Sequence, residues 1–314
     1  MTPPITIGIS AVILGLKGSD LHVLCVENEG SPALPYGPFD AEHHRTFELA
    51  LRQFVEDQAG FDVGYVEQLY TFGDKGREAP RADLGLDVTD TGKPPRVISV
   101  GYLALTPDAQ PARVSQARWR PVHQFFPWED WRVGAPSIIT DTIQPALAAW
   151  AQSADNQARL PATFALPEAW NEERVLERYE LLYEAGLVPE AARDRPHLHA
   201  PPPPIGQTMT SDHRRILATA VSRLRAKIKY RPVIFELMPA DFTLSELQEA
   251  AEAIAGGRLH KQNFRRAVEK SGLVEPTGQI KPSTGGRPAE LYRHLPRQHD
   301  GQPKLGLSLP RLRT

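Results

Sequence analysis

The stretch from Phe242 to Arg293 constrains the fold of this chain more than any other segment. It contains two short amphipathic helix patterns, followed by a basic, glycine-rich turn between two strand patterns. Thr243 and Glu246 have the T-x-x-E spacing of a capping box, which marks the start of the first helix. Two helices followed by a hairpin are typical of a winged helix-turn-helix, so DNA binding is the first functional class to consider.

The second helix of this stretch is expected to begin near Lys261 and to end at Gly272, which suits the C′ position. Its remaining faces carry residue types that meet phosphates and base edges in DNA complexes. The predicted DNA contacts on this helix are Lys261, Gln262, Asn263, Arg265 and Arg266. In the turn of the hairpin, Lys281 and Arg287 are the predicted phosphate contacts.

Positive charge is concentrated in this part of the chain. The 314 residues have a net charge of −2, so the molecule as a whole is not a polycation. From Arg258 to Arg293, however, eight Lys or Arg stand against three Glu, which gives a local charge of +5. Such a patch is the electrostatic footprint of DNA binding. The alternative is a winged helix used only for packing or protein contacts, because basic helix faces are often merely solvated.

Length and composition limit the number of domains and exclude several classes of protein. A chain of 314 residues with 41% hydrophobic content can form two or three cores. Cys25 is its only cysteine, which excludes a disulfide framework and a metal cluster built on thiolates. There is no secretory signal pattern, and no segment approaches the ~20 apolar residues of a membrane span. We therefore expect a cytoplasmic protein without a membrane partner.

The first 130 residues alternate between strand and helix patterns. Strand character is found in residues 5–14, 21–27, 63–72, 96–105 and 117–122. The first two of these segments flank a turn signal and predict a hairpin. One helix is expected over residues 41–59, capped by Asp40 and ended by Gly60. Mixed strands around one helix predict an α/β sandwich.

The middle of the chain has helical patterns near residues 138–152 and 168–186. A proline-rich linker at 196–204 favours polyproline II and is expected to act as a semi-rigid spacer. A further helix at about 210–229 leads into the winged helix.

Three segments near the N-terminus resemble a Nudix domain: residues 34–61 (LPYGPFDAEHHRTFELALRQFVEDQAGF), 65–77 and 96–105. Together with FTLSEL, NFRR and GRPAELYR near the C-terminus, they resemble a Nudix-related transcriptional regulator of NAD metabolism, of the larger NAD-biosynthesis type. The resemblance implies an α+β fold in four parts. These are a Nudix-like α/β/α sandwich that senses a ligand (1–135), a helical insertion with linker (136–209), a winged helix-turn-helix (210–295) and a tail (296–314), whose prolines and charges predict disorder.

The Nudix box of a catalytic family member is broken in this sequence. With Gly60 as the anchor, the positions expected to hold one Arg and three Glu are occupied by Gln53, Phe54, Asp57 and Gln58. Hydrolysis of a pyrophosphate depends on metal to neutralise developing charge. We therefore predict a domain that is not an enzyme and that requires no metal or cofactor. The alternative is a Nudix-type nucleoside-diphosphate hydrolase with a DNA-binding appendage, in which Glu48, Glu56 and Asp57 are displaced metal ligands.

The resemblance implies that this domain binds ADP-ribose, NAD or another adenine nucleotide as an effector. Aromatic rings would stack on the base and arginines would hold the phosphates, although core packing is the alternative for the aromatic residues. The expected ligand contacts are Tyr36, Phe39, Phe72, Asp74, Arg77 and Arg96. The implied function is a repressor of NAD biosynthesis genes that binds a palindromic operator of double-stranded DNA as a homodimer.

Overall fold

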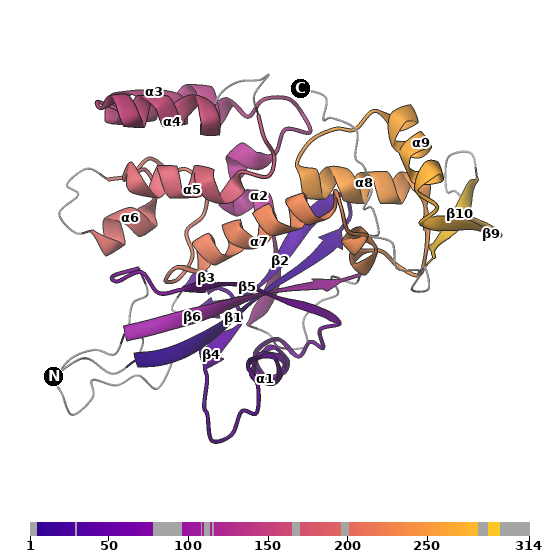
Figure 1. Cartoon of the computed structure of the whole chain (residues 1–314), viewed down its shortest axis with the longest axis horizontal. Helices are drawn as coiled ribbons and strands as arrows, with labels where there is room; N and C mark the ends of the chain where they lie inside the picture. Colours follow the sequence, from indigo (N-terminus) through magenta and orange to yellow (C-terminus); the bar gives the residue numbers. More distant parts are fainter. Residues whose placement is uncertain are drawn as a thin grey trace.

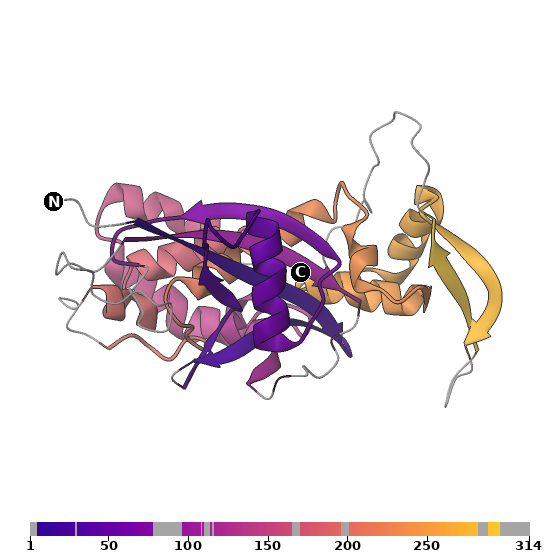
Figure 2. The same ribbon diagram turned by 90° about the horizontal axis from the view of Figure 1, so that it is seen from below.

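The computed structural model describes residues 5–28, 30–77, 96–107, 109, 114, 116–164, 170–195, 201–281 and 288–295. These residues form a mixed sheet with helix α1 on one face and a layer of helices on the other (Figure 1). The winged helix lies at one end of the molecule, and its hairpin extends beyond the end of the sheet (Figure 2). The architecture is α+β, as predicted.

The sheet has seven strands in the order β3-β2-β1-β6-β5, with β4 paired to β1 and β7 paired to β2. The strands are β1 (Ile5–Lys17), β2 (Asp20–Asn28), β3 (Ser31–Ala33), β4 (Tyr36–Pro38), β5 (Tyr65–Phe72), β6 (Arg96–Thr106) and β7 (Ala117–Pro121). Strands β1 and β6 are parallel, whereas β1 and β2 form the predicted antiparallel hairpin, whose last pair joins Lys17 to Asp20. The three-residue strands β3 and β4 were not predicted, because so short a segment carries no periodic pattern.

Helix α1 (Phe47–Ala59) packs on one face of the sheet and begins six residues later than expected. Its N-cap is Thr46, whose hydroxyl accepts a hydrogen bond from the Leu49 N–H at 3.2 Å. The prediction of Asp40 as the cap is wrong, because that carboxylate closes a separate turn by accepting from the Glu42 N–H at 2.8 Å. The predicted C-terminus is confirmed, since Gly60 ends the helix in the left-handed conformation (φ 61°).

The opposite face of the sheet is covered by the helical layer. Its helices are α2 (Val122–Phe125), α3 (Gln144–Trp150), α4 (Ala154–Phe164), α5 (Val175–Glu184), α6 (Pro189–Asp194) and α7 (His213–Lys227). Short 3₁₀ turns lie at Pro127–Glu129 and Val233–Leu237, and a π-helical turn at Ile139–Ile143 precedes α3. Helices α3, α5 and α7 correspond to predicted helices. Helix α4 was missed because Pro161 lies inside it.

The winged helix was predicted closely. It consists of β8 (Asp241–Thr243), α8 (Leu244–Ala255), α9 (Lys261–Ser271), β9 (Val274–Lys281) and β10 (Ala289–His294). The capping box at the start of α8 is complete, with Thr243 and Glu246 each accepting from the other's backbone N–H. Gly272 ends α9 in the left-handed conformation (φ 60°), as expected.

One continuous hydrophobic core joins the sheet, the helical layer and the winged helix. It includes Leu14 of β1, Leu182 of α5, Leu224 of α7 and Leu247 of α8. The core therefore crosses the boundaries that the sequence suggested between sensing domain, insertion and winged helix.

A buried ion cluster lies within this core where the three parts meet. The carboxylate of Glu129, which is 1% exposed, accepts two hydrogen bonds from Arg178 of α5 at 2.6 and 2.8 Å and one from Arg225 of α7 at 2.6 Å. Burial acts to raise the pKa of Glu129, but the two guanidinium groups outweigh it and hold the pKa below its ordinary value. The carboxylate is therefore ionised and links three segments that are distant in sequence.

The same cluster fixes the end of α8. Arg225 donates from Nε to the carbonyl oxygen of Ile254 at 2.8 Å, and the Trp131 N–H donates to the carbonyl oxygen of Gly256 at 2.6 Å. Gly256 has a φ of 71°, and a Cβ at this position would lie 2.2 Å from the carbonyl oxygen of Glu129. Only glycine permits this close approach, so α8 is held directly against the segment that carries Glu129.

We predict that Glu129→Gln destabilises the fold by about 3–5 kcal/mol, because it leaves two buried arginines without their counter-charge. Urea denaturation of the purified full chain measures the change. Glu177→Gln is the matched control: Glu177 is exposed on α5, and its replacement is expected to change stability by less than about 0.5 kcal/mol. Equal stability of the two variants would show that the cluster is not a stabilising link.

Candidate nucleic-acid interface and ligand cavity

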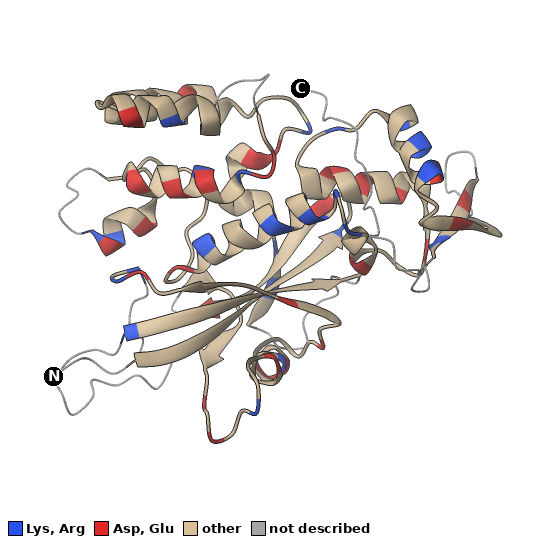
Figure 3. Cartoon of the chain, in the orientation of Figure 1, with Lys and Arg blue, Asp and Glu red and all other residues tan. Residues whose placement is uncertain are grey.

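Helix α9 presents the five predicted DNA-contacting residues on its exposed face. Phe264 and Val268 are fully buried and hold the helix against the core. The side chains that lie outside this contact are all exposed: Lys261, Gln262, Asn263, Arg265 and Arg266. Figure 3 shows Lys and Arg gathered on α9 at the outer end of the molecule. The structure thus places a basic, hydrogen-bonding surface on one accessible helix, and four of the five residues lie in its first five positions.

The turn before α9 is fixed by a buried acid that the sequence analysis did not single out. The carboxylate of Glu252, near the end of α8, accepts from the Leu259 N–H at 3.0 Å and from Arg258 at 2.8 Å. Gln248, one turn earlier, donates to the same carboxylate at 2.9 Å. These bonds set the angle at which α9 leaves α8. The four-residue spacing of Gln248 and Glu252 is a weak signal in the sequence, because solvated helix faces carry the same pattern.

The hairpin of the winged helix is paired to β8 in the order β8-β10-β9. Lys281, at the end of β9, forms an ion pair of 2.5 Å with Glu246 of the capping box. The predicted phosphate contact Lys281 therefore lies next to the N-terminus of α8. Arg287 lies outside the described residues.

A cavity of about 350 Å³ opens between β2, β4 and α1. It is lined by Val26, Glu27, Tyr36, Gly37, Pro38, Phe54, Asp57, Gln58, Val114 and Gln116. Its volume lies within the range of small-molecule sites in proteins. One of the six predicted ligand contacts, Tyr36, lines this cavity. Phe54, Asp57 and Gln58 were recognised in the sequence as Nudix-box positions but not as cavity residues.

The box positions on α1 hold the cavity wall in place. The Gln58 amide oxygen accepts from the Tyr36 N–H at 3.0 Å, and its nitrogen donates to the Tyr36 carbonyl at 2.5 Å. The ring of Phe54 lies over Gly37, where an added Cβ would be 2.6 Å from the ring. In the first turn of α1, Glu48 forms an ion pair with Arg52 at 2.9 Å. These side chains are therefore engaged with other parts of the protein.

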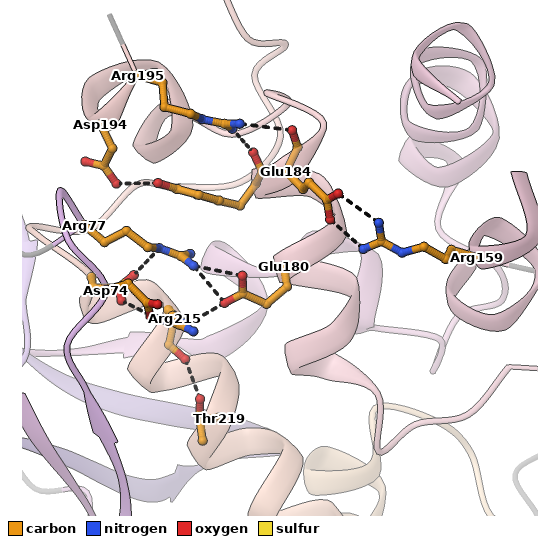
Figure 4. Close-up of polar contacts among 11 residues, drawn as sticks. Asp74, Arg77, Arg159, Glu180, Glu184, Asp194, Arg195, Arg215 and Thr219 are labelled. Atoms are coloured by element: carbon orange, nitrogen blue, oxygen red, sulfur yellow. Dashed lines mark hydrogen bonds and ion pairs between the residues drawn. The ribbon is translucent and has the colours of Figure 1, made fainter. Parts of the chain in front are cut away.

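Asp74 and Arg77 lie apart from the cavity lining, in an ion-pair network between the sheet and the helical layer (Figure 4). The Arg77 guanidinium contacts Glu180 of α5 at 2.9 Å and stacks on the Tyr183 ring, 3.7 Å from its centroid. Asp74 pairs with Arg215 of α7, which holds the pKa of that carboxyl below its usual value. Both residues thus contact the helical layer in this structure.

The other three predicted ligand contacts are also separate from the cavity lining. Phe72 is 2% exposed and belongs to the core under the helical layer. Phe39 packs edge-on against Phe47 of α1, with ring centroids 4.5 Å apart. Arg96, at the start of β6, is exposed and donates to the carbonyl oxygen of Gly73 at 2.7 Å.

Metal clusters and membrane spans are both absent from the part of the chain that the structure describes. Within it, no group of three or more His, Cys, Asp or Glu side chains is placed to hold a metal ion. Every helix in the described ranges is too short or too polar to span a bilayer.

Comparison with known proteins identifies the winged helix by sequence. Residues 234–294 match the family model of the NrtR DNA-binding winged helix domain. Over 89 residues, the chain is 45% identical to the ADPR responsive transcriptional repressor NtrR of Acinetobacter baylyi. This match covers 28% of the present chain and 35% of the relative, so it spans about a third of that protein's length.

The fold is similar to solved structures over most of the chain. The crystal structure of Shewanella oneidensis NrtR complexed with a 27mer DNA has a TM-score of 0.55 and 21% identity, covering 92% of this chain and 94% of that chain. A MutT/nudix family protein from Enterococcus faecalis has a TM-score of 0.52 and 16% identity, covering 94% and 88%. The expected resemblance is confirmed: the chain is similar to NrtR proteins by sequence in its winged helix and by fold over most of its length.

Proposed function

We propose that this chain is a DNA-binding transcriptional repressor of NAD biosynthesis genes. The observation that carries the proposal is the exposed basic face of α9, in a winged helix that matches the NrtR DNA-binding domain. The exposed side chains of α9 from Lys261 to Arg266 would enter the major groove, and Lys281 and Arg287 would contact phosphates from the hairpin. The protein would bind a palindromic operator as a homodimer, because two-fold symmetry in the protein matches repeated half-sites in DNA.

The Nudix-like domain is proposed to sense ADP-ribose, NAD or another adenine nucleotide in the cavity between β2, β4 and α1. The Acinetobacter relative is named as ADPR responsive, and the cavity has the volume of a small-molecule site. Tyr36 and Phe54 supply aromatic surface for a base or ribose. Both predicted arginines lie outside the cavity lining: Arg77 is held by Glu180, and Arg96 is exposed at the start of β6.

The domain is proposed to act without catalysis. At the box positions, Phe54 and Gln58 cannot supply metal-binding charge, and Gln58 is hydrogen bonded to the backbone of Tyr36. The acidic residue Glu48 is paired with Arg52. Mg²⁺-dependent cleavage of ADP-ribose or NAD by the purified chain, at ordinary enzyme rates, would instead favour the hydrolase alternative.

A gel-shift assay tests the regulator directly. The purified chain is expected to retard promoter fragments of NAD-synthesis genes at physiological salt, and one of ADP-ribose, NAD or ATP should change the retarded fraction. An effector must bind the DNA-competent and DNA-free forms with different affinity to have this effect. Absence of a specific shift would contradict the proposed function.

Substitutions on α9 test which face contacts DNA. Arg265→Ala and Arg266→Ala are each expected to weaken operator binding by about 1–3 kcal/mol and to leave nucleotide affinity unchanged. Lys270→Ala is the control, because it removes an exposed cation from the last turn of the same helix. Fluorescence anisotropy with a labelled operator measures the three affinities. If both arginine variants bind like wild type, another face of the winged helix contacts the bases.

Gly37→Ala tests the cavity. The added methyl group would lie 2.6 Å from the Phe54 ring, so the ring must move, and overpacking of this kind costs about 1–3 kcal/mol. We expect weaker nucleotide binding by calorimetry, with operator affinity in the absence of nucleotide unchanged. Gly64→Ala is the matched control, because a methyl group added at that position would have no other atom within 4 Å. Unchanged nucleotide affinity in Gly37→Ala would place the effector elsewhere.

A further inference from the structure

Two turns of the Nudix-like domain pack against each other, and the second of them contacts the turn between α8 and α9. The first is the β1–β2 turn, which includes Lys17, and the second is the loop that follows Glu129. The carbonyl oxygen of Arg132 in that loop accepts from Arg258 Nε at 3.2 Å, and the Trp131 N–H donates to Gly256 at 2.6 Å. In Figure 1, β1 ends and β2 begins on the side of the sheet nearest α8, and β2 contacts α8. The sheet thus reaches the helix-turn-helix at its turn.

Arg132 joins these two turns into one unit. Its guanidinium donates to Asp130 at 2.8 Å within the loop, to Asp20 at 2.6 Å in the β1–β2 turn, and to the carbonyl oxygen of Ser19. The negative charges of Asp20 and Asp130 are therefore paired with Arg132. This pairing weakens their repulsion of an anion at the surface. Burial acts to raise the pKa of Asp130, but the hydrogen bonds from Arg132 outweigh it and lower the pKa to about 2.

The residues left at the surface of this unit have the properties of a phosphate contact. Lys17 is exposed and forms no ion pair with another described residue. Val133 is 97% exposed at the tip of the loop, and Gly134 beside it has a φ of 111°. Arg258 pairs with Glu252, yet its side chain remains 60% exposed. Arg and Lys side chains and open backbone turns are the groups that proteins use to position DNA phosphates.

We propose that Lys17, Val133, Gly134 and Arg258 form a junction surface that contacts the DNA backbone beside the recognition helix. Helix α9 begins only three residues after Arg258, and its N-terminal half is the part proposed to enter the major groove. Groups that adjoin this end of the helix face the phosphates that border the groove. The junction surface rests on the proposed function, and it adds a DNA contact contributed by the Nudix-like domain.

Charge substitutions on the full chain test the junction surface. Lys17→Glu and Val133→Glu are expected to lower operator affinity several-fold, since each places a negative charge against a phosphate. Lys17→Ala should reduce the slope of log affinity against log salt by about 0.9, the value for one lost phosphate contact. Fluorescence anisotropy between low and physiological salt gives both quantities.

Two controls distinguish the loss of a DNA contact from effects of net charge and of side-chain size. Lys75→Glu makes the same charge change at an exposed site after β5, at the other end of the sheet, and should leave affinity near wild type. Val133→Gln has the size of the glutamate variant without its charge and should bind like wild type. Because Lys17 and Val133 are exposed, thermal unfolding is expected to be unchanged in all these variants.

The outcomes distinguish this inference from the proposed function. Wild-type affinity and salt slope in the Lys17 and Val133 variants, together with weakened binding by Arg265→Ala, would overturn the junction surface and leave the repressor in place. An equal loss in Lys75→Glu would also overturn it, since the effect would then come from net charge. Failure of the wild-type chain to bind any operator would instead contradict the proposed function.

Discussion

The arrangement of this molecule depends on one buried carboxylate. Glu129 follows the last strand of the sheet, and it holds Arg178 of α5 and Arg225 of α7 at hydrogen-bond distance with almost no access to solvent. Removing a charge from water costs several kcal/mol, so such a group persists only where its bonds are complete. Arg225 then donates to the end of α8. The position of the winged helix is thus set by the same bonds that hold the helical layer on the sheet.

Under the proposed function, this link determines how a ligand signal would reach DNA. Strand β2 lies between the two parts: Val23 and Cys25 belong to the core shared with α8, whereas Leu24 and Val26 belong to the core under α1. Val26 also lines the cavity. A change at the cavity wall would therefore be transmitted through packed side chains rather than through a free linker. In the proposed homodimer, such a change would act on how the two copies are oriented.

The elements that sequence analysis predicted well have strong local signals. The capping box of Thr243, the glycine ends of α1 and α9 and the β1–β2 hairpin each depend on a few neighbouring residues. Elements without such signals were missed, among them the strands of three residues and α4 with its internal proline. The error at Asp40 has the same origin, because two nearby capping residues compete and only the folded turn decides between them. Helical periodicity predicted which side chains of α9 are buried and which are exposed. The predicted DNA contacts on α9 are therefore all exposed.

The sequence by itself determined the winged helix and the basic face of α9, because these follow from residue identity and short-range spacing. Only the tertiary structure decided the roles of Arg77, which pairs with Glu180, and of Gln58, which supports the cavity wall. It also decided that Glu129 meets Arg178 and Arg225, and that Arg132 links the β1–β2 turn to Arg258 before α9. Those contacts join residues separated by dozens to hundreds of positions. The identity of a charged residue does not show whether it will contact water, another side chain or a ligand. Burial and distance decide which of these it contacts, and both exist only in the folded chain.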